Sequence, residues 1–177
     1  MTWILILTTI SFAIYIAYNV AALAQFGVPK SLSETYYLYG GTSRPNLKHL
    51  FTAMMVSMAM LLMPAWIDIS DGNNFQFTSF IAACGIIFTG LIPEFRKSKF
   101  DGTAHTVCAS TAAAAAILWI LLVAKSWWIL LIVFGAVVIG AVCTKTYKTA
   151  LTYWLETIAF ISTFSSIIYH YHWIFLG

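Results

Sequence analysis

The last apolar stretch of the chain, residues 150–175, contains a carboxylate, a hydroxyl and an imidazole at regular spacing. Glu156, Thr163 and His170 follow one another at intervals of seven residues. In an α-helix, this spacing brings the three side chains close to one face. A carboxylate in an apolar segment is costly unless it meets a partner or water, so Glu156 marks a candidate site for binding or proton exchange. The alternative is structural: Glu156 pairs with one neighbour, and Thr163 bonds to its own helix backbone.

Other ionisable side chains cluster in the polar connections between the apolar stretches, where Glu156 could meet them. We expect Glu156 to be the central acid of a pocket, with His105 and His49 as its titratable partners. Glu34, Arg44 and Glu94 would form the rim of this pocket, and Asp101 flanks the start of the fourth segment with His105. The full candidate ligand-binding set is Glu156, His105, His49, Glu94, Glu34, Arg44 and Asp101.

The histidines do not form a metal-binding pattern. A catalytic zinc usually takes three protein ligands, and the chain has no His-x-x-x-His motif. His170 and His172 are two residues apart, so on a helix they point to different faces. We therefore expect no metal and no cofactor, although a site made of His49, His105 and a carboxylate stays geometrically open.

Nucleophilic and nucleic-acid chemistry lack their usual signatures. Ser31 and Ser33 do not lie in a Gly-x-Ser-x-Gly motif, so catalytic residues stay unassigned. Cys84, Cys108 and Cys143 occur singly and are typical of small buried side chains. The net charge of +3 comes from short basic loops, so no nucleic-acid partner is expected.

The composition of the chain indicates which elements must position these groups. Only 8% of the residues are charged, 61% are hydrophobic, and the mean hydropathy is +0.87. A water-soluble domain would carry about 25% charged residues. Apolar runs of about 20 residues are long enough to cross a bilayer, where the α-helix satisfies every backbone polar group. The sequence therefore predicts an all-α polytopic membrane protein, with the lipid bilayer as its main partner.

Six apolar segments divide the whole chain, residues 1–177, which we interpret as a single transmembrane domain. The predicted six-helix bundle consists of residues 3–24, 47–67, 77–93, 104–124, 127–144 and 150–175. The fourth and fifth segments are joined by a tight turn, and both carry small residues, in 112–116 and at Ala136 and Gly140. Because small residues let helices approach closely, we expect these two helices to pack together.

The first apolar segment has a second interpretation. Ala22, Leu23 and Ala24 resemble a signal-peptidase cleavage site. However, the segment lacks a basic start, and its apolar run exceeds the usual 7–15 residues of a signal peptide. We expect it to be kept as a transmembrane helix.

The basic residues predict the orientation of the bundle. The first, third and fifth loops hold eight of the nine lysines and arginines, while Lys125 alone lies on the other side. Short loops rich in Lys and Arg stay in the cytoplasm. We therefore expect a plasma (inner) membrane protein with both termini outside and a pocket that faces the cytoplasm.

The first loop, residues 27–49, is the longest polar stretch of the chain. Ser31 and Glu34 fit a capping box, which predicts a short interfacial helix over residues 32–39. Gly40 and Gly41 would end this helix. Pro45 then suits the first turn of the second transmembrane helix.

Two short motifs resemble a known family. The sequence FTGLIPE at residues 88–94 is followed by a basic loop and by His105 at the start of an alanine-rich helix. Residues 28–35, VPKSLSET, are similar to a Pro-x-Ile-Ser-Asp-Thr segment, from which Leu32 and Ser33 depart. Together these motifs resemble uncharacterised six-helix bacterial membrane proteins of the DRAM/Frag-like group. The resemblance implies a six-helix bundle and no particular activity.

The function predicted from these features is binding or translocation of a small ligand, a lipid headgroup or a proton at the cytoplasmic pocket. One alternative is a membrane-embedded enzyme that acts on a lipid of the inner leaflet. Another is a structural subunit of a membrane complex. The identity of the ligand and the oligomeric state stay open at this point.

Overall fold

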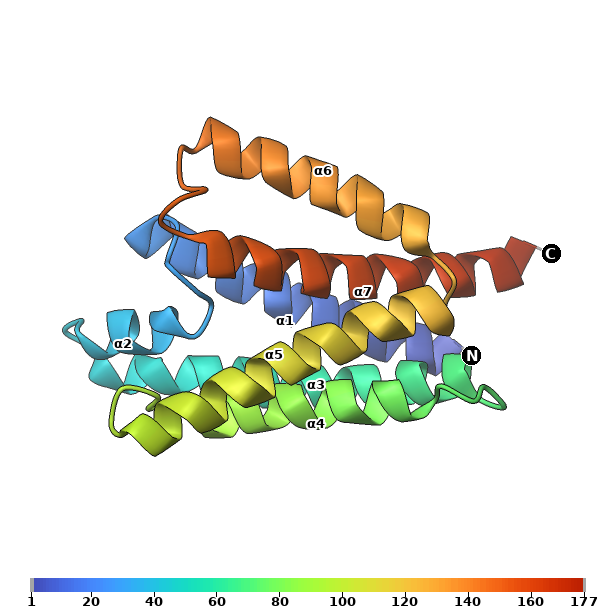
Figure 1. Ribbon diagram of the computed structural model, residues 1–177, viewed down its shortest axis with the longest axis horizontal. Helices are drawn as coiled ribbons and strands as arrows, with labels where there is room; N and C mark the ends of the chain where they lie inside the picture. The colour runs from blue at the N-terminus through green and yellow to red at the C-terminus, as the bar shows by residue number, and fades with distance from the viewer. Residues whose placement is uncertain (1, 177) are drawn as a thin grey trace.

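The computed structural model describes residues 2–176, with side chains for residues 2–172, and this part of the chain is entirely helical. Seven α-helices and one 3-10 helix follow one another (Figure 1). Their bounds are α1 Thr2–Phe26, α2 Glu34–Gly40, η1 Pro45–Lys48, α3 His49–Ser70, α4 Phe77–Leu91, α5 Lys99–Leu122, α6 Trp127–Cys143 and α7 Leu151–Leu176. The predicted all-α class is confirmed.

Four stretches are long and apolar enough to cross a membrane: Thr2–Phe26, Pro45–Ser70, Lys99–Leu122 and Leu151–His172. The helices α4 and α6 are also apolar but have only 15 and 17 residues, whereas a crossing helix needs about 20. The number of long spans therefore differs from the six that the sequence predicted.

The odd-numbered connections gather at one end of the bundle. The α1–α3 connection with α2, the α4–α5 loop and the α6–α7 loop lie at the left of Figure 1, and both termini lie at the right. The turns 71–76 and 123–126 join helices at the end that holds the termini. Eight of the nine basic residues therefore share one end of the molecule.

The short helix α2 begins two residues later than predicted. The Ser31 hydroxyl accepts a hydrogen bond from the Glu34 backbone N–H at 3.1 Å. The residue directly before α2 is Ser33, however, and its side chain forms no capping bond. The Glu34 carboxylate does not complete a capping box and instead contacts Arg96. On the other face of α2, Tyr39 is buried and its ring packs edge-on against Phe26 of α1 at 4.9 Å.

The small residues of α5 pack against α4, which corrects the expected pairing with α6. A Cβ atom on Gly85 of α4 would lie 2.7 Å from the Ala112 Cβ and 2.9 Å from the Cys108 carbonyl oxygen. The helices α5 and α6 separate beyond their shared turn, and α6 lies along α7 (Figure 1). Gly140 of α6 accordingly faces the Trp154 ring of α7, which a Cβ would meet at 3.8 Å.

Gly85→Ala is expected to lower the free energy of unfolding by about 1–3 kcal/mol, because the new methyl group overlaps the α5 backbone. Gly135→Ala is the matched control, since a Cβ there has no neighbour within 4 Å. The control should be neutral or stabilising by up to about 1 kcal/mol, as expected for Ala in place of Gly within a helix. Thermal unfolding in detergent would measure both variants. Equal unfolding temperatures for the two variants would contradict the close α4–α5 packing.

Candidate functional site

His105 lies at the centre of the polar end of the bundle, and both of its ring nitrogens are hydrogen-bonded. Nδ1 lies 2.7 Å from the Ile92 carbonyl oxygen, and Nε2 lies 2.8 Å from the Ser33 hydroxyl. Because a carbonyl oxygen only accepts, Nδ1 must carry a hydrogen. In the neutral ring, Nε2 then accepts the hydrogen of the Ser33 hydroxyl. The Phe95 ring stacks on the imidazole at 4.8 Å and fixes its plane.

The local sequence explains why these groups are available to His105. The last carbonyls of an α-helix have no partner within the helix. The residue before a proline is moreover pushed out of the helical conformation, and Ile92 follows α4 directly and precedes Pro93. Its carbonyl is therefore free for a side-chain donor. On the other helix, Ser98 caps the start of α5 by accepting from the Asp101 N–H at 3.0 Å, which sets where His105 lies.

Glu156 contacts the same polar segment from the opposite side. Its Oε2 accepts a hydrogen bond from the Leu32 backbone N–H at 2.6 Å. One turn earlier in α7, the Tyr153 N–H donates to the Lys30 carbonyl oxygen at 3.1 Å. The first turns of α7 thus hold the connection that precedes Ser33.

A groove opens beside these groups, with a volume of about 790 Å³. Ser33, His105 and Glu156 lie along it together with Ser31. Most of its remaining wall is apolar and comes from α5, α6 and α7: Ala109, Ala113, Ala114, Ile117, Leu130, Leu131, Phe134, Leu155 and Ile158. No lysine or arginine is among the residues described along this groove. The hydroxyl groups of Thr106, Ser110 and Thr152 also border the groove. Its wall is therefore mostly apolar, with Ser33, His105 and Glu156 among the polar groups along it.

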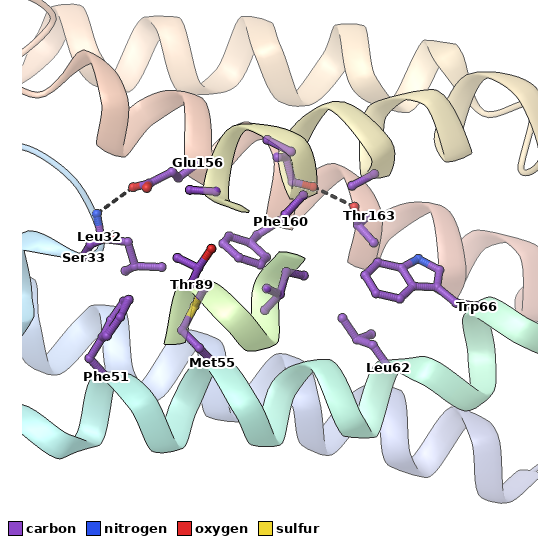
Figure 2. Close-up of a pocket in the computed structure, with 16 residues that line it drawn as sticks. Leu32, Ser33, Phe51, Met55, Leu62, Trp66, Thr89, Glu156, Phe160 and Thr163 are labelled. Atoms are coloured by element: carbon purple, nitrogen blue, oxygen red, sulfur yellow. Dashed lines mark hydrogen bonds between the residues drawn. The ribbon is translucent and has the colours of Figure 1, made fainter. Parts of the chain in front are cut away.

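A smaller cavity of about 40 Å³ lies inside the bundle, and Glu156 borders it as well (Figure 2). Ser33 and Glu156 border both spaces. This volume is enough for about three or four water molecules, at roughly 10–15 Å³ of such space each. Trp66 borders the cavity, and its buried indole N–H has no hydrogen-bond partner.

Of the three residues spaced seven apart in α7, two lie beside the same cavity. Glu156 and Thr163 both border the inner cavity (Figure 2). The Thr163 hydroxyl donates to the Ala159 carbonyl oxygen at 2.8 Å, as the structural alternative for the hydroxyls predicted. His170 lies near the other end of α7, beside Tyr171, whose hydroxyl donates to Asp68 at 2.8 Å.

The remaining candidates lie apart from Glu156. His49, Glu94 and Asp101 border a separate surface pocket of about 500 Å³. The Tyr36 hydroxyl donates to Glu94 at 3.1 Å. This bond, followed by the ammonium of Lys97 at 3.4 Å, lowers the pKa of the Glu94 carboxyl.

Two further candidates lie at the surface. Arg44 is exposed, and its backbone N–H bonds to the Thr42 hydroxyl at 3.2 Å. Glu34 forms an ion pair with Arg96 at 2.5 Å. The candidate set therefore divides between the groove, the separate pocket and the surface, and Glu156 and His105 are the members that share the groove. Glu156 forms no ion pair with either histidine among the described residues, because its partner is a backbone N–H.

Sequence reasoning missed Ser33 as a partner of His105, along with the backbone groups of Leu32 and Ile92. Pro93 was the signal in the sequence for a free carbonyl at Ile92, because a proline there ends α4 shortly before the helix that carries His105. Among the side chains that the structure describes, no group of three His, Cys, Asp or Glu residues is arranged to hold a metal ion.

The arrangement can hydrogen-bond a polar group, move a proton between Ser33 and His105, and hold an apolar chain beside them. The chain matches no family model, no curated protein and no solved structure with which it was compared, so its resemblance to the DRAM/Frag-like group stays a prediction.

Proposed function

We propose that this chain is an integral membrane protein that binds one lipid-like, amphipathic molecule. The polar group of this ligand would lie at Ser33, His105 and Glu156, and its apolar chain along α5, α6 and α7. The observation that carries the proposal is the composition of the groove, which is apolar along most of its wall and polar where these three side chains meet.

The size and lining of the groove support a ligand of this class. Ligand pockets usually have volumes of about 300–1,000 Å³ and few, well-placed polar groups, and this groove measures about 790 Å³. An acyl chain gains free energy when apolar walls remove it from water or from a poorly packed surface. The carboxylate of Glu156 favours a ligand group that donates hydrogen bonds or carries positive charge, such as a hydroxyl or an ammonium.

The outer surface of the bundle supports a membrane setting. Ile132 and Ile139 of α6 are 63% and 65% exposed, which is costly in water and favourable in lipid. We propose that α4 and α6 also cross the bilayer, which makes six spans. With the basic loops in the cytoplasm, the polar end of the groove would face the inner leaflet.

Lipid retention tests the proposal. The parent protein, purified in a mild detergent, should keep one lipid in native mass spectrometry after excess lipid has been washed away. Ile117→Trp places an indole in the groove and should lower this retention about ten-fold. Leu118→Trp is the matched control, because the next residue of α5 is exposed and borders neither space. Its retention should equal that of the parent. A parent that keeps no lipid, or an equal loss in both variants, would refute groove binding.

A further inference from the structure

Ser33 and His105 together have the geometry of an activated nucleophile. The Ser33 hydroxyl lies 2.8 Å from Nε2, within the range expected for a nucleophile and its general base. Both residues are buried, at 3% and 5% exposure, and both border the groove. The pair therefore meets the groove with little competing water.

The Ile92 carbonyl is the third group that orients the base of such a pair. A base of this kind is oriented by an acceptor on its other nitrogen, which selects the tautomer and steadies the imidazolium that forms. The Ile92 oxygen lies 2.7 Å from Nδ1 and holds the hydrogen there, so the Nε2 lone pair faces Ser33. The Phe95 ring stacks on the imidazole and limits its rotation. A neutral carbonyl stabilises the imidazolium less than a carboxylate does, so slow turnover is expected.

We propose that Ser33 is the nucleophile, and His105 the general base, of an acyl-transfer site for the carboxylic ester of a lipid. The inference rests on the proposed binding of an amphipathic ligand, because the groove would deliver the acyl chain to Ser33. Glu156 acts as a positioning residue, since its carboxyl group accepts the backbone N–H of Leu32, the residue before Ser33.

The proposed reaction hydrolyses the ester in two stages, with water as the second substrate. The Ser33 oxygen bonds to the ester carbonyl carbon while its proton moves to Nε2 of His105. The bond between that carbon and the alcohol oxygen breaks, and the alcohol leaves with the proton from Nε2. Water then gives a proton to Nε2 and adds to the acyl carbon, the bond to Ser33 breaks, and the Ser33 oxygen regains the proton.

A fluorophosphonate with a long alkyl chain tests the nucleophile, because an activated serine displaces fluoride and forms a stable phosphorus–oxygen bond. The full chain in lipid nanodiscs should gain one adduct, which peptide mass spectrometry places on Ser33. Ser33→Ala should abolish labelling. Ser43→Ala is the matched control, because Ser43 is exposed in the α2–η1 loop and does not border the groove. Its labelling should equal that of the parent.

A His105→Gln variant that keeps the parent's unfolding temperature should be labelled at least about 100-fold more slowly. This loss matches the usual contribution of a general base. If that variant unfolds, the comparison of Ser33→Ala with Ser43→Ala decides the proposal. An unlabelled parent, an adduct on another residue, or undiminished labelling in a folded His105→Gln variant would overturn it.

The lipid-retention measurement separates this proposal from the one on which it rests. A parent that keeps one lipid but takes no fluorophosphonate would refute acyl transfer alone. A parent that keeps no lipid, yet is labelled on Ser33 by a short-chain fluorophosphonate, would refute groove binding while the nucleophile stands.

Discussion

Glu156→Leu is expected to release the connection before α2 from α7 and to lower the free energy of unfolding by about 1–3 kcal/mol. The Glu156 carboxyl accepts the Leu32 N–H at 2.6 Å, and a buried donor that loses its partner costs about 1–3 kcal/mol. Leucine keeps the apolar contacts but leaves the backbone donor without a partner. Because the peptide that precedes Ser33 would lose its anchor, lipid retention in the groove should fall as well.

Hydrogen exchange at the Leu32 amide reports this change directly, since opening of the bond exposes that amide first. Glu156→Gln is the matched control, because its side-chain oxygen can still accept the Leu32 N–H while the charge is removed. It should keep slow exchange and most of the stability. Slow exchange in the leucine variant as well would show that the Tyr153–Lys30 bond alone holds this connection.

Local signals in the sequence predicted the helical elements well. The expected segments 77–93 and 127–144 became α4 Phe77–Leu91 and α6 Trp127–Cys143. The hydrogen bond between Ser31 and Glu34 was anticipated because it joins residues three positions apart. Helix ends of this kind are set by neighbouring side chains and by proline, so they can be predicted from a short stretch of sequence.

The candidate site was predicted less well, because its contacts join distant parts of the chain. His105 and Ser33 are 72 residues apart, and Glu156 and Leu32 are 124 apart. Backbone donors and acceptors also carry no signature in the sequence, since nearly every residue has them. The charge pattern grouped His49 with His105 at one end of the bundle. Helix packing decides which side of the bundle each histidine faces. In the structure it places His49 and His105 at different pockets.

The packing of small residues shows the same limit. Ala112 was correctly recognised as a residue that permits close approach. Its partner, Gly85, lies in the preceding helix rather than in the next one. Periodicity identifies a face of a helix, but the choice between two neighbouring helices depends on the shapes of all the side chains at both contacts.

Cysteine labelling in intact cells should differ more than ten-fold between the two ends of the bundle. Cys84, Cys108 and Cys143 would first be replaced with alanine. In that background, Asn74→Cys should react with a membrane-impermeant maleimide, because the α3–α4 turn lies at the end with few basic residues. Ser43→Cys, in the basic α2–η1 loop, should react only after the membrane has been permeabilised.

The two positions are matched controls for each other. Asn74 and Ser43 are both polar, exposed residues of short connections, so a cysteine at either is equally accessible once the membrane is open. The result decides which leaflet meets the groove, because Ser43 belongs to the end that carries Ser33 and His105, and Asn74 to the opposite end. Labelling of Ser43→Cys alone in intact cells would reverse the orientation. A lipid bound at Ser33 would then come from the outer leaflet, and the water for acyl transfer from outside the cell.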